Sequence, residues 1–143
     1  MFKDDLKSWK RIEREFASRL MKRDVSKIEF SEWKFPDRDV KATFHKQGQI
    51  YEKTFEIKED RVAERTGNVW IEYMCNGKPS GIYTSKADII VYKLWDEFRY
   101  VDRAKLLVEL CTCVKENVFG WDNNSSQLFL LKREVFNLLT TEL

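Results

Sequence analysis

The spacing of apolar residues changes near residue 25, and this change constrains the fold more than any other feature of the sequence. Residues 2 to 22 carry apolar side chains at steps of three and four: Phe2, Leu6, Trp9, Ile12, Phe16 and Leu20. This spacing predicts a helix with one buried stripe. From Ser26 to Lys58 apolar and polar residues alternate, which predicts strands that bury one face. The chain therefore begins with an amphipathic helix and continues into a sheet.

Three strands are predicted within the alternating region, over residues 26–33, 39–46 and 50–58. Gly48 supplies a turn between the second and third strands. Consecutive strands with such short connections pair in an antiparallel meander.

Further elements are predicted downstream of residue 58. They are a strand over 68–74 in a hairpin-like insertion, a polar segment over 80–88, an interior strand over 89–95, a helix over 102–117, a loop over 123–127, a strand over 127–132 and a closing helix over 133–143. This order predicts the α/β (α+β) class, with a mixed central sheet flanked by helices. A length of 143 residues predicts one domain, over residues 1–143.

Composition and charge exclude several classes of protein. Hydrophobic residues make up 43% and charged residues 35% of the chain, which is too apolar for a disordered protein. No segment has the roughly 18 apolar residues of a membrane span, and no secretory segment precedes the first helix. We expect a cytoplasmic protein that does not enter membranes, in the host cytoplasm if its source is viral. The net charge of +2 excludes a polycation, so only local basic surfaces such as Lys10 and Arg14 are candidates for phosphate contacts.

The cysteines and the single histidine do not predict a site of their own. Cys75, Cys111 and Cys113 are odd in number, and two of them lie two residues apart in a predicted helix, where their side chains diverge. His45 has no second histidine with which to form a metal cluster, and it is expected on the surface of a strand.

A carboxylate and an amine are predicted to share one face of the strand over 50–58. Phe55 and Ile57 alternate with Glu56 and Lys58, so the two charged residues project from the polar face. Asp39 opens the preceding strand and would bring a second carboxylate near Glu56. With the main-chain carbonyl of Ile57, these oxygens suit Mg²⁺, or Mn²⁺ in its place. The alternative is an ion pair on a strand face, since Glu-x-Lys is a common sequence.

The predicted site has the chemistry of phosphodiester hydrolysis. A metal ion there would polarise a phosphate and lower the pKa of a bound water, while Lys58 would orient that water or balance developing charge. Glu13 is a further candidate, because at 100° per residue it falls within the apolar stripe of the first helix. A carboxylate on a buried face requires a partner.

These motifs resemble those of known nucleases. Asp39 followed by a strand that ends Glu56-Ile57-Lys58 resembles the D-x(n)-E-x-K signature of the PD-(D/E)XK nuclease superfamily. Residues 13–20 resemble the ERxxxSRL run of archaeal-type Holliday-junction resolvases, which selects Glu13. Downstream of Lys58 the motifs resemble those of small bacteriophage nuclease-like proteins, over residues 66–72, 76–82 and 84–88. The resemblance covers about residues 10 to 95.

The resemblance implies a restriction-endonuclease-like core and a Mg²⁺-dependent deoxyribonuclease, acting on DNA that could be branched or forked. It implies Asp39, Glu56 and Glu13 as metal ligands and Lys58 as a catalytic residue. The stretch between Asp39 and Glu56 is longer than in many members. Asp37 is a competing first acid, but it follows Pro36 and fits a turn, whereas Asp39 opens the strand.

Two questions stay open at the level of sequence. Glu72 could face the same site or be a solvated hairpin carboxylate. Ser80, Thr84, Ser85 and Lys86 could grip a phosphate, or their segment could be a capped turn before the strand over 89–95.

The function also has an alternative: a catalytically inactive module on the same fold that binds nucleic acid or inhibits a protein. A nuclease that cuts both strands symmetrically would be expected to form a homodimer.

Overall fold

The computed structural model describes residues 2–30, 39–112, 114–119 and 125–143, and it describes side chains for 11–30, 39–112 and 125–143. Asp37, Cys113 and the side chain of Lys10 therefore lie outside the described part. The elements follow in the order α1 (Phe2–Leu20), β1 (Val25–Phe30), β2 (Val40–Lys46), β3 (Gln49–Glu59), α2 (Arg61–Thr66), β4 (Asn68–Cys75), β5 (Lys78–Pro79), the 3-10 turn η1 (Gly81–Tyr83), β6 (Ile89–Leu94), β7 (Glu97–Asp102), α3 (Arg103–Leu110), β8 (Val114–Phe119), β9 (Ser125–Lys132), α4 (Arg133–Leu139) and β10 (Thr141–Glu142).

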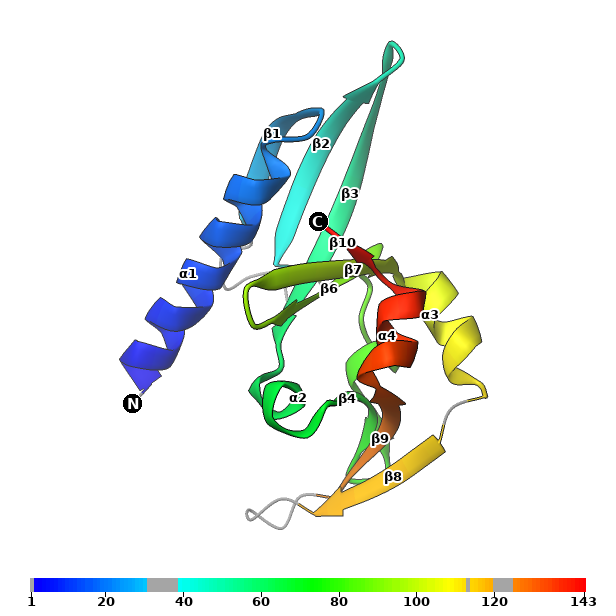
Figure 1. Cartoon of the computed structure of the whole chain (residues 1–143). Helices are drawn as coiled ribbons and strands as arrows, with labels where there is room; N and C mark the ends of the chain where they lie inside the picture. The colour runs from blue at the N-terminus through cyan, green and yellow to red at the C-terminus, as the bar shows by residue number, and fades with distance from the viewer. Residues whose placement is uncertain (1, 31–38, 113, 120–124) are drawn as a thin grey trace.

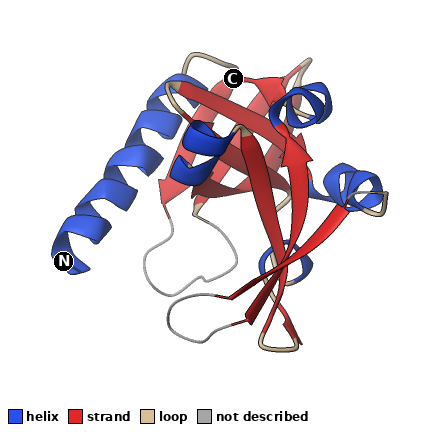
Figure 2. Cartoon of the chain, turned by 60° about the horizontal axis from the view of Figure 1, so that its bottom comes forward, coloured by secondary structure: helices blue, strands red, loops and turns tan. Residues whose placement is uncertain are grey.

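The strands form two sheets. The first sheet has six strands in the order β1-β2-β3-β6-β7-β10, and the second has four in the order β5-β4-β9-β8. In the first sheet β3 and β6 run parallel, while the other neighbours are antiparallel. Helices flank the strands, as Figures 1 and 2 show. The predicted α/β (α+β) class with a mixed sheet is confirmed, and so is the meander of β1, β2 and β3.

The meander turns sharply between β2 and β3. Lys46 pairs with Gln49, and the two residues between them, Gln47 and Gly48, have φ angles of 52° and 75°. Positive φ at both positions is the geometry of a type I′ turn, whose twist matches that of the strands. This turn fixes the register, and the register decides which face each side chain occupies.

The first sheet has a hydrophobic core on each face. On one face α1 packs against the sheet through a cluster formed by Ile12, Phe16, Leu20, Val40, Ala42, Phe55, Ile57, Val91 and Phe98. On the other face the second sheet, α3 and α4 supply a cluster that includes Ile71, Ile90, Tyr92, Leu106, Phe129 and Phe136. The sheet is therefore an inner layer, covered by α1 on one side (Figure 1).

Three predictions for the C-terminal third are wrong. The helix predicted over 102–117 ends at Leu110, because Val114–Phe119 pairs with β9 as a strand. The loop predicted over 123–127 already contains the start of β9 at Ser125. The closing helix ends at Leu139, and the chain then pairs with β7 as β10. In the first and third cases pairing with a distant strand overrides local periodicity.

Downstream of residue 58, α2 and β7 were also not predicted. The turn between β6 and β7 consists of Trp95 and Asp96, with Trp95 at a φ of 54°. A tryptophan rarely adopts this conformation, so the sequence carries none of the usual signals of a hairpin. Within the described residues, no helix has both the length and the apolar composition that crossing a bilayer requires.

Candidate functional site

Glu56 and Lys58 lie side by side on β3, as the sequence predicted. Phe55 and Ile57 are 3% and 1% exposed and face α1, so the residues that alternate with them face away from it. Lys58 Nζ lies 3.1 Å from Glu56 Oε1, and the two side chains are 34% and 25% exposed. The pair is thus half-buried, which limits its screening by water.

Asp39 reaches β3 from the residue before β2. Its backbone N–H donates to the carbonyl of Phe55 at 2.9 Å, and its Oδ2 accepts a hydrogen bond from the Ile57 N–H at 2.7 Å. The Asp39 carboxylate is therefore held beside the backbone that links Glu56 to Lys58. The predicted approach of a second carboxylate is confirmed.

The Asp39 carboxylate lies in an environment that disfavours its ionised form, in part because Glu56 is nearby. Burial raises the pKa of Asp39 above its ordinary value, and the charge of Glu56 raises it further, while the Ile57 N–H and the Lys58 ammonium act in the opposite direction. Burial and a neighbouring like charge both disfavour the ionised form. A cation between Asp39 and Glu56 would offset both effects and favour the ionised carboxylates.

The carbonyl of Ile57 faces the same edge as Asp39. The N–H and C=O of one strand residue point to the same side, and the Ile57 N–H points to Asp39. The register between β2 and β3 begins at Val40 and Phe55, so Ile57 lies beyond it. The Asp39 carboxylate and the Ile57 carbonyl therefore lie at the same edge of β3, where the charge of Glu56 also acts on Asp39.

The segment between η1 and β6 is tied to β3. Ser85 is only 9% exposed, and its hydroxyl donates to Glu56 Oε2. Asp88 Oδ2 accepts from the Thr54 N–H at 2.9 Å and from the Thr54 hydroxyl at 3.1 Å. This segment therefore acts as a brace that orients Glu56 before the chain enters β6.

Tyr92 is a neighbour of the site that the sequence did not reveal. It stands opposite Lys58 in the register of β6 and is buried. Burial raises the pKa of its hydroxyl, and the charges of Asp60 and Glu56 raise it further. Tyr92 belongs to the apolar run over residues 89–95, and a residue in such a run is expected in the hydrophobic core rather than beside a functional site.

Glu13 does not join the two carboxylates. Among the described residues, no group of three or more His, Cys, Asp or Glu side chains lies close enough to hold a metal ion. Glu13 lies on α1, which packs against the face that carries Phe55 and Ile57, whereas Glu56 projects from the opposite face. The expectation that Glu13 completes the metal site is therefore not met in this structure.

The residues expected to contact phosphate mostly have protein partners. The Ser80 hydroxyl donates to Glu72 Oε2 at 3.0 Å, and the Thr84 hydroxyl donates to the Gly81 carbonyl at 3.2 Å. Lys86 and Arg14 are exposed. A phosphate would therefore meet charged side chains here, while the hydroxyl groups already bond to the protein.

Glu72 has a structural role on the second sheet. Its two carboxylate oxygens accept hydrogen bonds from Ser80 at 3.0 Å and from Ser126 at 2.9 Å. These bonds link β4 to β9 and to the start of η1. The position matches neither of the two alternatives for Glu72, a metal ligand or a solvated carboxylate.

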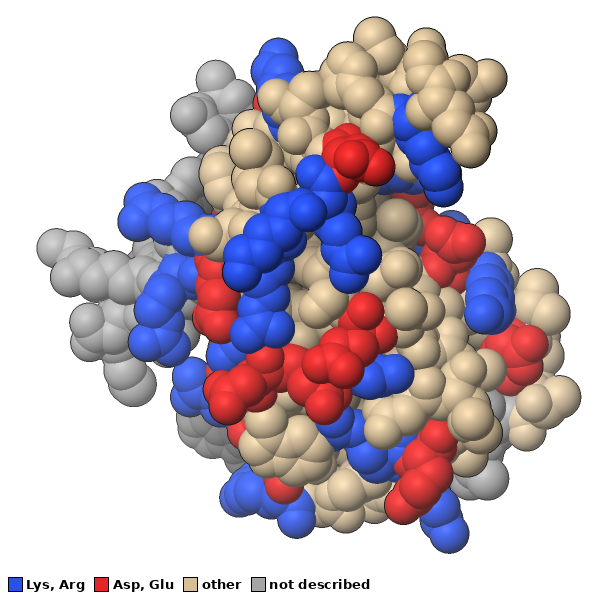
Figure 3. Space-filling view, turned by 45° about the horizontal axis from the view of Figure 1, so that its top comes forward, with Lys and Arg blue, Asp and Glu red and all other residues tan. Residues whose placement is uncertain are grey.

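Charges of both signs share the surface of the molecule seen from the top of Figure 1. Figure 3 shows Lys and Arg side chains interleaved with Asp and Glu on this face, without a broad field of one sign. Recognition of a phosphate backbone on this face would therefore depend on individual basic side chains rather than on a general positive potential.

The donors fit a hard divalent cation with one condition. Carboxylate and carbonyl oxygens are the ligands that Mg²⁺ and Mn²⁺ prefer. Both oxygens of Glu56 already have partners, Lys58 and Ser85. A metal would therefore have to displace the Lys58 ammonium from Glu56 Oε1, which would free Lys58 for another role.

Comparisons of the chain with models of protein families, with curated proteins and with solved structures find no match. The chemistry of this site therefore rests on its own geometry.

Proposed function

We propose that this chain is a metal-dependent endonuclease that hydrolyses phosphodiester bonds in DNA, with branched or forked DNA as its expected substrate. The observation that carries the proposal is the Asp39 carboxylate, which is held at the Ile57 amide and lies close enough to Glu56 for the two charges to interact, with Lys58 beside Glu56. Burial and the charge of Glu56 both disfavour the ionised form of Asp39. A cation bound between Asp39 and Glu56 would remove this cost.

The order of elements also supports the proposal. A first helix, a three-stranded meander, Glu56-Ile57-Lys58 on the third strand and a parallel neighbour β6 are compatible with the restriction-endonuclease-like core that the resemblance to PD-(D/E)XK nucleases implies. Asp39 precedes β2, the position that the D-x(n)-E-x-K signature gives to the first acid.

In this proposal each residue has a defined role. Asp39, Glu56 and the Ile57 carbonyl would hold Mg²⁺ or Mn²⁺. The bound ion would polarise the scissile phosphate and lower the pKa of a coordinated water. Lys58, released from Glu56, places its ammonium where it can orient the attacking water and balance charge on the phosphate. Ser85 keeps the Glu56 carboxylate in position through its hydrogen bond.

A second candidate, a binding or inhibitory module without catalysis, is favoured by one observation. The Lys58 ammonium and the Ser85 hydroxyl already satisfy both oxygens of Glu56. A site of this kind would be a structural ion pair with no affinity for metal.

Calorimetric titration with Mn²⁺ separates the two candidates. The wild type is compared with Glu56→Gln and with Glu52→Gln. Glu52 is a matched control, because it also lies on β3 and pairs with a lysine, Lys41, at 3.1 Å. The nuclease proposal expects binding by the wild type and Glu52→Gln and its loss in Glu56→Gln. Absence of binding by the folded wild type would favour the module.

A further inference from the structure

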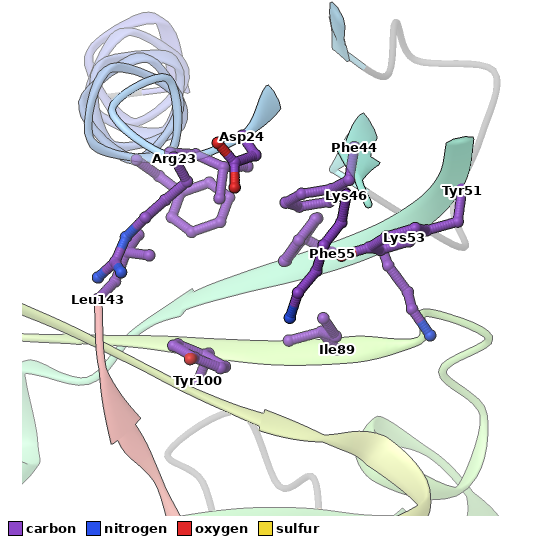
Figure 4. Close-up of a pocket in the computed structure, with 12 residues that line it drawn as sticks. Arg23, Asp24, Phe44, Lys46, Tyr51, Lys53, Phe55, Ile89, Tyr100 and Leu143 are labelled. Atoms are coloured by element: carbon purple, nitrogen blue, oxygen red, sulfur yellow. The ribbon is translucent and has the colours of Figure 1, made fainter. Parts of the chain in front are cut away.

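A second candidate binding site lies on the opposite face of the first sheet. An open pocket with a volume of about 360 Å³ is bordered by the end of α1 and the turn that follows it, by the hairpin of β2 and β3, by β6 and β7, and by Leu143 (Figure 4). It is lined by Phe16, Leu20, Arg23, Asp24, Phe44, Lys46, Tyr51, Lys53, Phe55, Ile89, Tyr100 and Leu143. Asp39, Glu56 and Lys58 do not line it, so it is separate from the candidate metal site.

The register of the hairpin explains this separation. Val40 pairs with Phe55 and Phe44 with Tyr51, so these side chains share the face that meets α1. Lys53 alternates with Thr54 and lies on that same face, whereas Glu56 lies on the other. One strand, β3, thus presents different chemistry to the two sides of the sheet.

One wall of the pocket is aromatic. The rings of Phe44 and Tyr51 stack with centroids 5.2 Å apart and an interplanar angle of 9°, and Phe44 also lies 6.3 Å from Phe55. Tyr51 is 38% exposed although it belongs to this wall. The flat ring of a ligand could therefore pack against these aromatic side chains and be shielded from water.

Three cations border the same space. Arg23 approaches from the end of α1, while Lys46 and Lys53 extend from the hairpin toward Ile89 (Figure 4). Within the described part of the chain, none of the three has an ion-pair partner, in contrast to Lys41 and Lys58. Asp24 is the one acidic side chain that lines the pocket. The pocket therefore has an excess of positive charge, which favours an anionic ligand.

We propose that this pocket binds a nucleotide, with its base against Phe44 and Tyr51 and its phosphate on Lys46 and Lys53, while Arg23 adds positive charge on the opposite side of the pocket (Figure 4). The volume lies near the lower end of the range of about 300 to 1,000 Å³ for small-molecule sites, which suits one nucleotide rather than a duplex. Guanidinium and ammonium groups bind phosphate through charged hydrogen bonds. Aromatic side chains hold bases by stacking.

The nucleotide could be a free molecule or the unpaired end of a DNA strand, because both present the same ring and phosphate. The proposal does not rest on the nuclease activity, since the two sites lie on opposite faces of the sheet. If both proposals hold, one face would hold a strand end while the other performs chemistry.

Calorimetry with the full chain tests this proposal. The probes are deoxyadenosine monophosphate, deoxyadenosine, inorganic phosphate and a 5′-phosphorylated single-stranded decanucleotide, all in EDTA so that no metal contributes. We expect the mononucleotide or the phosphorylated strand to bind, and deoxyadenosine and phosphate alone to bind more weakly. Tighter binding of the strand would identify a strand end as the natural ligand, and tighter binding of the mononucleotide would identify a free nucleotide.

Two variants locate the binding. Lys46→Gln combined with Lys53→Gln should weaken it at least about tenfold, because each lysine supplies a charged hydrogen bond. Lys41→Gln is the matched control, because Lys41 lies on β2 but faces the other side of the sheet. It should leave binding unchanged. Thermal melting of each variant shows whether it is folded.

Two results would overturn the proposal. One is that neither the mononucleotide nor the phosphorylated strand binds to the folded wild type at millimolar concentration. The other is binding that Lys46→Gln with Lys53→Gln leaves intact, because the ligand would then occupy another part of the molecule.

Discussion

Ser85→Ala tests whether the segment before β6 braces the candidate site. The substitution removes the hydroxyl that donates to Glu56 Oε2 and leaves the backbone of the segment unchanged. A hydrogen bond to a charged acceptor contributes about 1.5 to 3 kcal/mol to the free energy of unfolding. Glu56 is 25% exposed and keeps its contact with Lys58, so water can replace part of the lost bond.

We therefore expect Ser85→Ala to lower the free energy of unfolding by about 1 kcal/mol. For a chain of this length, that loss corresponds to a fall in Tm of about 3 °C. Urea denaturation followed by circular dichroism measures the free energy, and a thermal melt measures the Tm. Thr84→Ser serves as the control, because it keeps a hydroxyl that can donate to the Gly81 carbonyl.

A double-mutant cycle ties the loss to Glu56. If Ser85 acts through Glu56, then Ser85→Ala should cost much less in a Glu56→Gln background, with a coupling free energy of at least about 0.5 kcal/mol. Additive effects of the two substitutions would show that Ser85 stabilises the chain in another way. In that case the brace, and the orientation of Glu56 that depends on it, would be refuted.

Phe16→Ala should lower the free energy of unfolding by about 3 to 5 kcal/mol, because Phe16 is 1% exposed beneath α1, and a loss below about 1 kcal/mol in urea denaturation would contradict that packing. Asp39→Asn should raise stability at pH 7, because the raised pKa of Asp39 means that its charged form opposes folding. In the wild type, protonated Asp39 favours the folded state, and this contribution is lost as the pH rises from the ordinary pKa of 3.8 through the raised pKa of the folded state. Urea denaturation between pH 3.5 and 7 should therefore show a fall in the unfolding free energy of the wild type that Asp39→Asn lacks. Gly81→Ala should lower the free energy of unfolding by more than about 2 kcal/mol, because Gly81 has a φ of 51° and the new methyl group would overlap the Glu72 carbonyl. Gly77→Ala is the control and should cost about 1 kcal/mol, because Gly77 has a φ of 78° but open space around it. Equal losses of stability in a thermal melt of the two variants would contradict this prediction.

Local patterns were sufficient for the part of the fold that contains the candidate site. The stripe of α1 and the alternation of β3 depend only on neighbours in sequence, so the placement of Glu56 and Lys58 on one face could be predicted. Gly48 marked the turn that sets the register, and the register brought Asp39 toward Glu56.

The rest required long-range information. β8 and β10 exist because they pair with β9 and β7, and nothing in residues 114–119 or 141–142 reveals those partners. Periodicity predicted Glu13 on the buried stripe of α1, where it is partly buried, but the face of the sheet against which α1 packs is a tertiary property. The partner of Ser85 was hidden for the same reason, because 29 residues separate it from Glu56.

The most direct test of the account is DNA cleavage by the wild type, Glu56→Gln and Glu52→Gln. Labelled single-stranded, duplex, forked and four-way DNA are each incubated with Mg²⁺, Mn²⁺ or EDTA, and the products are separated on denaturing gels. The account predicts cleavage of at least one substrate by the wild type and Glu52→Gln, its loss in EDTA, and its loss in a Glu56→Gln variant that remains folded. Cleavage that persists in Glu56→Gln, or a folded wild type that cuts none of these substrates, would contradict it.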